Sequence, residues 1–433
     1  MRRAQLLGIA AVAAVVAAGV LSLAGPPRPG CGAGSDETPE GRAPTTVELT
    51  PAVAAVFERD SYAPRSTATL DVWSRARGVT LQLFHAGPEK QRTVGYTTME
   101  GVAVGPPRSL GAVTPQSCVA VRVGPWASGL YFARLTARDG RIGFALFVVR
   151  PARLGAAPVA VVMPTQTWQA YNYRDENHDG VSDTWYADTH RSEVELVRPF
   201  LDRGVPPHFR QYDLGFLEWL ARTGKHVDFL SDADLGAVPT GDALARAYRL
   251  VVFPGHEEYV TTHEYDVVER YRDLGGNLAF LSANAFFYRV ERRGDDLVRT
   301  GRWRDLGRPE AKLIGVQYLD WNNDCHPNQP FVVTGAAPDR WLFRGTGLVN
   351  GSRFGAFGIE IDAPTRDSPP GLQVLADIPD AFGPGETATM TYYTTPGGAK
   401  VFAAGAFTLG GAANWPVVST LLDNLWARLS VEL

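Results

Sequence analysis

The sequence has few cysteines and little net charge, and each shortage excludes a class of protein. Its three cysteines, Cys31, Cys118 and Cys325, are too few for a fold held together by disulfides. In an oxidising compartment we predict that Cys118 pairs with Cys325, which leaves one thiol over. The 42 basic and 46 acidic residues give a net charge of −4, so no polycationic surface is expected and nucleic acid is not a predicted partner.

Common catalytic signatures are also missing. The chain has no Gly-x-Ser-x-Gly elbow, no Walker loop and no Gly-x-Gly-x-x-Gly on a strand. His256-Glu257 begins like the zinc-peptidase motif, which needs a second histidine one helical turn later. Position 260 is valine and His263 is seven residues away, so that motif fails.

What the chain does have begins with an export signal. Arg2 and Arg3 precede an apolar run of small residues that ends at Ala24, as in secretory leaders. We predict a signal peptide over 1–24, a disordered Pro/Gly-rich linker over 25–46, and a secreted protein without membrane contact after cleavage. The alternative is an uncleaved membrane anchor, because the run is about long enough to span a bilayer.

Residues 47–152 have the pattern of an antiparallel β-sandwich. Short β-branched and apolar runs alternate with turn residues, and Asp139-Gly140 separates two of them, which is a strong hairpin signal. We predict an immunoglobulin-like sandwich here. Nothing in it suggests catalysis, so we interpret it as a packing or adhesion module.

Residues 155–433 change to an α/β pattern. Continuous apolar runs at 159–163, 250–253 and 278–281 are typical of strands buried on both faces. Between the last two, a helix with a capping box at Thr261 and Glu264 ends at Gly275-Gly276, which predicts a right-handed parallel crossover. A strand near 400–404 and a helix over 416–429 close the chain. We therefore predict an α/β fold with a doubly wound, mostly parallel sheet.

In such a sheet, ligands bind at the carboxyl ends of the strands. Three loops with polar and aromatic residues follow strands there, at 165–173, 255–259 and 282–284. The predicted binding site lies among these loops.

An acidic loop within 175–183 resembles a calcium site. Asp175, Asn177, Asp179 and Asp183 occupy positions one, three, five and nine, and Gly180 occupies position six, which suits a hard cation with oxygen ligands. Position twelve is Tyr186, so the usual bidentate carboxylate is missing. We predict structural calcium at this loop; the alternative is a polar turn without a metal.

Four short motifs occur in an order that resembles a known family. They are TWQAYN (167–172), WL (219–220), GHEEY (255–259) and GIEID (358–362). Together they resemble the carboxyl-terminal domain of the N,N-dimethylformamidase large (beta) subunit family. The resemblance implies a glutamine-amidotransferase-like α/β fold without the usual cysteine nucleophile.

The resemblance also implies a metal site. In the family's enzyme a mononuclear iron bound by two tyrosines and a glutamate activates water for amide hydrolysis. Carried over, Tyr259 and Glu360 become iron ligands and Tyr212 is the candidate for the second tyrosine. His256 and Asn284 become the candidate catalytic neighbours, with His256 placed for proton transfer.

Two functions follow from these observations. The first is an exported, metal-dependent hydrolase of an amide C–N bond in a small molecule. The second is a non-catalytic exported protein that binds a cell-wall or carbohydrate ligand. Whether the chain forms a homo-oligomer or needs an accessory subunit stays open in both.

Overall fold

The computed structural model describes residues 53–431, apart from 77, 92, 94, 114, 115, 189, 323–325 and 335–340. The expected signal peptide, the linker and Cys325 lie outside the described residues, so export, the anchor alternative and the Cys118–Cys325 pair stay predictions. Cys118 itself lies exposed on strand β7. No helix in the described part of the chain is long and apolar enough to cross a membrane.

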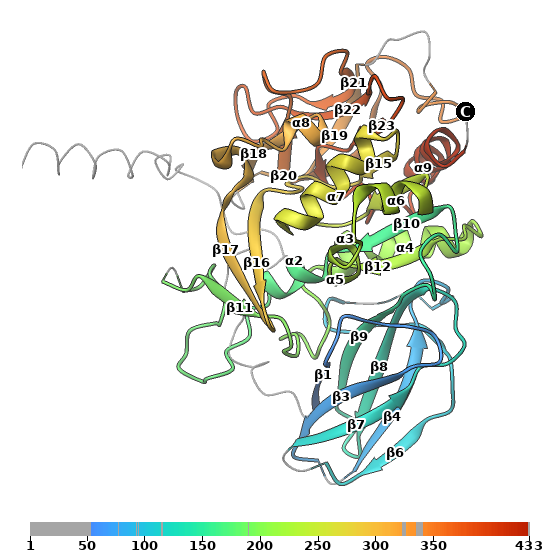
Figure 1. Cartoon of the computed structure of the whole chain (residues 1–433), viewed down its shortest axis with the longest axis vertical. Helices are drawn as coiled ribbons and strands as arrows, with labels where there is room; N and C mark the ends of the chain where they lie inside the picture. The colour runs from blue at the N-terminus through green and yellow to red at the C-terminus, as the bar shows by residue number, and fades with distance from the viewer. Residues whose placement is uncertain are drawn as a thin grey trace, which may run out of the picture.

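The amino-terminal part packs two sheets face to face, at one end of the molecule's long axis (Figure 1). One sheet has the order β1-β3-β7, and the other has the order β2-β9-β8-β4-β5 with β6 also paired to β4. The pairing is antiparallel except between β2 and β9. Alternate residues of the strands face inward, as for Leu70 and Val72, because side chains alternate across a strand. The strands are β1 (Val53–Phe57), β2 (Ser61–Tyr62), β3 (Thr67–Ser74), β4 (Val79–His85), β5 (Val102–Ala103), β6 (Arg108–Gly111), β7 (Gln116–Arg122), β8 (Gly129–Ala137) and β9 (Ile142–Val149).

The second part begins with parallel strands in the order β12-β10-β13-β15-β23. On β10, Val159 and Val161 belong to one apolar core, and Ala160 and Val162 belong to the core on the opposite face of the sheet. The predicted capping box of Thr261 and Glu264 forms at the start of α7. The elements here are β10 (Val159–Met163), α2 (Thr165–Ala170), α3 (Phe209–Tyr212), α4 (Leu214–Arg222), β12 (Asp228–Ser231), α5 (Asp232–Gly236), α6 (Gly241–Ala247), β13 (Leu250–Phe253), β14 (Tyr259–Thr261), α7 (Thr262–Asp273), β15 (Asn277–Phe280), β23 (Lys400–Ala403) and α9 (Pro416–Leu429).

The same sheet continues beyond β23 as antiparallel strands in the order β22-β21-β19-β20-β18, with β24 paired to β20. A further sheet, β11-β17-β16-β14, lies beside it (Figure 1). These elements are β11 (Glu193–Glu195), β16 (Tyr288–Arg293), β17 (Asp296–Arg302), η2 (Trp303–Leu306), α8 (Ala311–Ile314), β18 (Gln317–Trp321), β19 (Gln329–Val333), β20 (Arg353–Ala363), β21 (Gln373–Ile378), β22 (Ala388–Thr394) and β24 (Ala406–Phe407).

The prediction of a doubly wound, mostly parallel α/β sheet of the glutamine-amidotransferase type is therefore wrong. Strands dominate the described chain in several sheets, and parallel pairing covers only one part of the largest of them. The physical reason lies in residues 288–394, where the chain turns back through hairpins and antiparallel strands instead of adding further strand–helix units. The strand and helix at 400–403 and 416–429 do form, but they close a mixed sheet.

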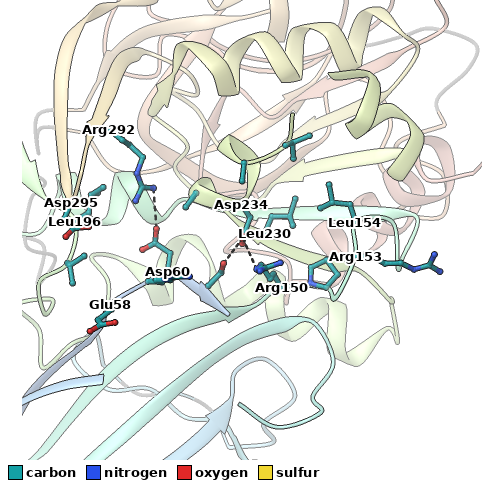
Figure 2. A pocket seen from close by; sticks show the side chains of 17 residues that line it. Glu58, Asp60, Arg150, Arg153, Leu154, Leu196, Leu230, Asp234, Arg292 and Asp295 are labelled. Carbon is teal, nitrogen blue, oxygen red and sulfur yellow. Dashed lines mark hydrogen bonds and ion pairs between the residues drawn. The ribbon is translucent and has the colours of Figure 1, made fainter. Parts of the chain in front are cut away.

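The two parts meet at a seam that contains a charged pocket of 570 Å³. Figure 2 shows Arg292 reaching from β16 toward Asp60, and Arg150 lying against Asp234 of α5. The Ser61 hydroxyl also donates to Asp234, at 2.7 Å. These contacts join the β1–β2 turn of the sandwich to α5 and β16, so the two parts are held together by polar contacts at this point.

Candidate functional site

The loop after β13 is buried although it is polar. His256, Glu257, Glu258 and Tyr259 are all at most 4% exposed. A Cβ on Gly255 would lie 2.2 Å from Asp213 Oδ1, so any larger residue where the chain enters the loop would displace the Asp213 side chain. The Thr167 hydroxyl accepts from the amides of Glu258 and Tyr259, at 3.1 and 3.4 Å. The loop is thus fixed by α2, which follows the neighbouring strand β10.

Alternate residues of this loop face opposite sides. His256 and Glu258 lie on one side, where His256 Nε2 is 3.3 Å from Glu258 Oε2 and 3.6 Å from Glu360 Oε2. The Tyr171 hydroxyl donates to Glu258 Oε2 at 2.7 Å, and the Tyr186 hydroxyl donates to the same oxygen at 3.2 Å. Two carboxylates, one imidazole and two phenols therefore converge at the strand ends.

Tyr259 joins this cluster through Tyr186. The two phenol oxygens are in direct hydrogen-bonding contact, and Trp185 Nε1 donates to the Tyr259 oxygen at 3.3 Å. Tyr259 also stacks on Tyr288, with ring centroids 5.4 Å apart. Tyr259 is fully buried, so its hydroxyl is held in one place.

Glu360 reaches the cluster from a bulge in β20. The pairing of β20 with β24 shifts register between Gly358 and Ile361, and such a bulge re-aims the side chains within it. Ile359 in the bulge has a φ of 65°, a left-handed conformation that is strained for a β-branched residue. The strained bulge places the Glu360 carboxylate beside His256.

Tyr212 lies on another side of His256. Its ring meets the imidazole edge to face at 6.4 Å, and Phe407 lies against both rings, with centroids at 5.0 Å from Tyr212 and 4.7 Å from His256. The structure therefore brings Tyr212, His256, Tyr259 and Glu360 into one neighbourhood, although they come from three different segments, α3, the loop of residues 255–259 and β20.

Asn284 follows β15 and is also buried. Its amide donates to Asp362 Oδ1 at 2.8 Å, two residues beyond Glu360, and its side-chain Oδ1 has no hydrogen-bond partner among the described residues. It thus borders the cluster from the strand next to β13.

Burial shifts the protonation of the cluster. Burial, with a smaller effect from His208, lowers the pKa of His256 to about 3, so its imidazole is neutral near pH 7. Burial and the neighbouring Glu258 raise the pKa of Tyr259 well above its ordinary value. Because His256 is neutral, it supplies no positive charge to the two carboxylates beside it.

Behind the loop, Glu257 faces a second group of acids. Its carboxyl contacts Asp232, with Glu264 nearby, and burial raises the pKa of Glu257 strongly and that of Asp232 to about 7. Gln166 Nε2 links this group to the loop by donating to Glu264 and to the Tyr259 carbonyl. These acids support the loop from the side away from His256.

The predicted calcium loop has a different construction. Asp175 accepts from the Gly180 amide, Asn177 from the Asp179 amide and Asp179 from the Val181 amide, at 2.8–2.9 Å. Asp183 accepts from the Glu176 amide and pairs with Arg191. Among the described residues, no three His, Cys, Asp or Glu side chains group so as to hold a metal ion by themselves. A metal at either site would therefore need other ligands, such as phenols or carbonyls.

Sequence reasoning missed Glu258, Tyr171 and Tyr186 as members of the cluster. Glu258 could have been found from alternation, because it is two residues from His256 in an extended loop. Tyr171 lies in one of the loops at the strand ends, but Tyr186 had no local signal, because the chain between them is irregular.

Comparison with known proteins gives the family of this chain. The model of the N,N-dimethylformamidase beta subunit-like, C-terminal family matches residues 109–416, which is well over half of the chain. The chain belongs to this family. The match begins in the sandwich, within β6, and includes every residue of the cluster described above.

A curated relative is the N,N-dimethylformamidase beta subunit of Alcaligenes sp., which is 25% identical over 264 residues. The match covers 47% of this chain and 34% of the relative, so the chain spans about a third of the relative's length. Solved structures give only local likenesses. A superoxide reductase (neelaredoxin) from Ignicoccus hospitalis is 10% identical, covers 24% of this chain and 86% of its own, and has a TM-score of 0.17. The sulfur carrier protein SoxY from Chlorobium limicola is 10% identical, covers 24% and 82%, and has a TM-score of 0.15.

Proposed function

We propose that this family member is a metal-dependent hydrolase that cleaves an amide C–N bond at the cluster around His256. The observation that carries the proposal is the convergence of phenols, carboxylates and one neutral imidazole at the carboxyl ends of the strands. Membership of a family named for an amide hydrolase supports the same reaction. Water would add to the acyl carbon and the C–N bond would break, giving a carboxylic acid and an amine.

The donor chemistry of the cluster fits a ferric ion. Phenol and carboxylate oxygens are hard ligands, and the buried cluster holds both kinds without a charged imidazole. We propose Tyr259, Tyr212 and Glu360 as ligands, with Tyr186 as the alternative second phenol because its oxygen contacts that of Tyr259 directly. A bound ion would polarise the amide carbonyl and lower the pKa of a water molecule.

The surrounding residues have roles that do not depend on the ion. His256 Nε2 is buried beside two carboxylates and has no hydrogen-bond partner among the described residues, which places it to take a proton from the attacking water. Glu258 lies 3.3 Å from that nitrogen and is itself fixed by Tyr171, which positions it to stabilise the protonated ring. Asn284 offers its side-chain amide to orient the substrate.

The test compares iron content and hydrolysis of N,N-dimethylformamide in the wild-type protein, three Tyr→Phe variants of the candidate ligands and one Tyr→Phe control. We expect one iron per chain in the wild type, and loss of iron together with a fall of at least about 10²-fold in kcat for Tyr259→Phe. Tyr212→Phe and Tyr186→Phe identify the second ligand, since only the ligand's loss releases iron. Tyr265→Phe is the matched control, because Tyr265 is equally buried in another core. A wild type without iron, or a Tyr259→Phe variant with full iron, would overturn the proposal.

Two further features belong to this proposal. We propose that the protein acts outside the cytoplasm, because residues 1–24 are predicted to be a leader. We also propose that calcium binds the loop of residues 175–183, with carbonyl oxygens as additional ligands.

The relative's name marks it as one subunit of an enzyme. We therefore propose that this chain works with an accessory subunit or as a homo-oligomer. Size-exclusion chromatography with light scattering of the purified chain distinguishes a monomer from an assembly.

A further inference from the structure

A cleft of 1110 Å³ lies between the sandwich and helices α3 and α4. One wall is the loop between β4 and β5, which includes Glu89 and Tyr96, and the opposite wall is formed by α3 and α4. The cleft is distinct from the charged pocket of Figure 2, which lies at α5 and β16.

The two walls of the cleft are in contact with each other at two points. Gly87 has a φ of 107°, and a Cβ there would lie 3.0 Å from the Leu217 carbonyl of α4, so glycine lets the sandwich loop approach the helix backbone. Arg210 of α3 lies over the Tyr96 ring, 5.3 Å from its centroid, a cation–π contact across the cleft. The sandwich is thus part of the cleft, and its loop is held at a fixed distance from the second part.

The floor of the cleft adjoins the proposed catalytic cluster. Ile359 and Thr408 line the floor, and Ile359 packs against the rings of Tyr212 and Phe407. Those two rings in turn lie against His256. One layer of side chains therefore separates the cleft from His256, and the strained residue Ile359 belongs to that layer.

The lining indicates a neutral polar ligand. Three side-chain amides, those of Gln91, Gln211 and Asn328, offer polar groups to a ligand, whereas the Asn414 amide already donates to Glu218 and accepts from Arg222. The charged side chains of the lining are mixed in sign, with Lys90, Arg210 and Arg222 beside Glu89 and Glu218, so the cleft does not select an ion of one sign. Two aromatic side chains stay accessible, with Tyr96 38% exposed and Trp415 44% exposed, and exposed aromatics in a cleft provide flat apolar faces for stacking.

We infer that the cleft binds an extended, uncharged oligosaccharide that carries N-acyl groups, and that it holds one such group against Ile359, whose displacement would open the layer between the cleft and the cluster. This substrate class rests on the proposed amide hydrolysis. Sugar rings have an apolar face for Tyr96 and Trp415 and hydroxyls for the side-chain amides. A cleft this large exceeds the roughly 300–1,000 Å³ of a site for one small molecule, so it is far larger than a simple dialkyl amide needs. Hydrolysis would leave a carboxylic acid and an amino sugar.

The experiment is calorimetric titration of the whole protein with tetra-N-acetylchitotetraose. Cellotetraose, which has the same chain length without amides, and an N-acetylated tetrapeptide are the comparison ligands. We expect the acetylated sugar to bind at least about tenfold more tightly than either, and Tyr96→Ala or Trp415→Ala to weaken its binding by about three- to tenfold. Val102→Ala and Leu274→Ala, at positions 45% and 41% exposed outside the cleft, should change the Kd less than twofold.

Hydrolysis of N,N-dimethylformamide is measured on the same preparations and separates the two proposals. Tight sugar binding that depends on Tyr96, in a protein without amide hydrolysis, supports the cleft and overturns the proposed enzyme. Hydrolysis without binding of the acetylated sugar at millimolar concentration overturns the cleft alone. Preference for cellotetraose or for the peptide, or equal binding by Tyr96→Ala and the wild type, also overturns the inferred ligand.

Discussion

The sequence contains two polar loops that are predicted to bind ligands or metals. In the structure they differ in their hydrogen-bond partners and in their burial. In the loop of residues 175–183, the side-chain oxygens accept from amides two to seven residues away in the same loop. In the loop of residues 255–259, the partners are Thr167, Tyr171 and Tyr186, which are 72 to 92 residues away. The first loop is mostly exposed, and the second is almost completely buried.

The difference shows what a short polar motif can establish. Asp and Asn side chains bond to amides two residues on in ordinary turns, so the spacing in 175–183 has a local explanation without a metal. No local interaction accounts for buried polar side chains at 256 and 258, whose burial is costly unless distant partners satisfy them. The loop with distant partners is therefore the better candidate for chemistry.

Removing a distant partner of the loop of residues 255–259 should give the largest loss in the free energy of unfolding. Thr167→Val keeps the shape of the side chain and leaves the buried amides of Glu258 and Tyr259 without their acceptor. We expect a loss of about 1–3 kcal/mol in the free energy of unfolding, measured by urea denaturation. Asp179→Ala removes one acceptor in the exposed loop and should cost less than about 0.5 kcal/mol.

Thr420→Val is the control for Thr167→Val. Its hydroxyl donates to the Pro416 carbonyl on the exposed side of α9, so its removal should leave stability within about 0.5 kcal/mol. Equal losses for Thr167→Val and Asp179→Ala would show that the loop of residues 255–259 does not depend on its distant partner.

The same contrast explains how far the sequence could predict this protein. Strands β10, β13 and β15 and the capped helix α7 were predictable, because each is a continuous apolar run or a capping box within a few residues. The antiparallel half was not, since strands such as β18 (QYLDW) mix polar and exposed residues and are fixed by pairing with β20. The loop that holds His256 and Tyr259 was found by its position after a strand, and their roles came from the family resemblance, whereas Tyr186 became visible only when the fold brought it to Tyr259.

The loop between β4 and β5, which borders the cleft, combines a local contact with burial. Glu89 in this loop shows both. The Gly87 amide donates to its Oε2 at 2.5 Å, a local contact, yet burial raises the pKa of Glu89 to about 7. The folded state therefore binds this proton more tightly than the unfolded state does. The resulting stabilisation is complete below about pH 4.5 and is lost as the pH rises through about 7.

We expect Glu89→Gln to remove this pH dependence. Relative to the variant, the wild type should lose stability between pH 5 and pH 8, by less than about 1 kcal/mol because Glu89 is partly exposed to solvent. Urea denaturation of both proteins at the two pH values measures the difference. Glu193→Gln, at an exposed position of β11, is the control. A stability difference between the wild type and Glu89→Gln that is the same at pH 5 and pH 8 would contradict the raised pKa of Glu89.

The smallest expected effect belongs to calcium at the loop of residues 175–183. Its carboxylates already accept from local amides, and a carboxylate oxygen with a remaining lone pair can still bind an ion. With a Kd near 1 mM, as in weak extracellular sites, 1 mM calcium would add about 0.4 kcal/mol and raise the Tm by roughly 0.5–1 °C. We expect this rise in the wild type and not in Asp179→Ala. Because local bonds alone can hold this loop, identical melting temperatures with and without calcium would assign it to turn chemistry, and the contrast with the buried loop would then be complete.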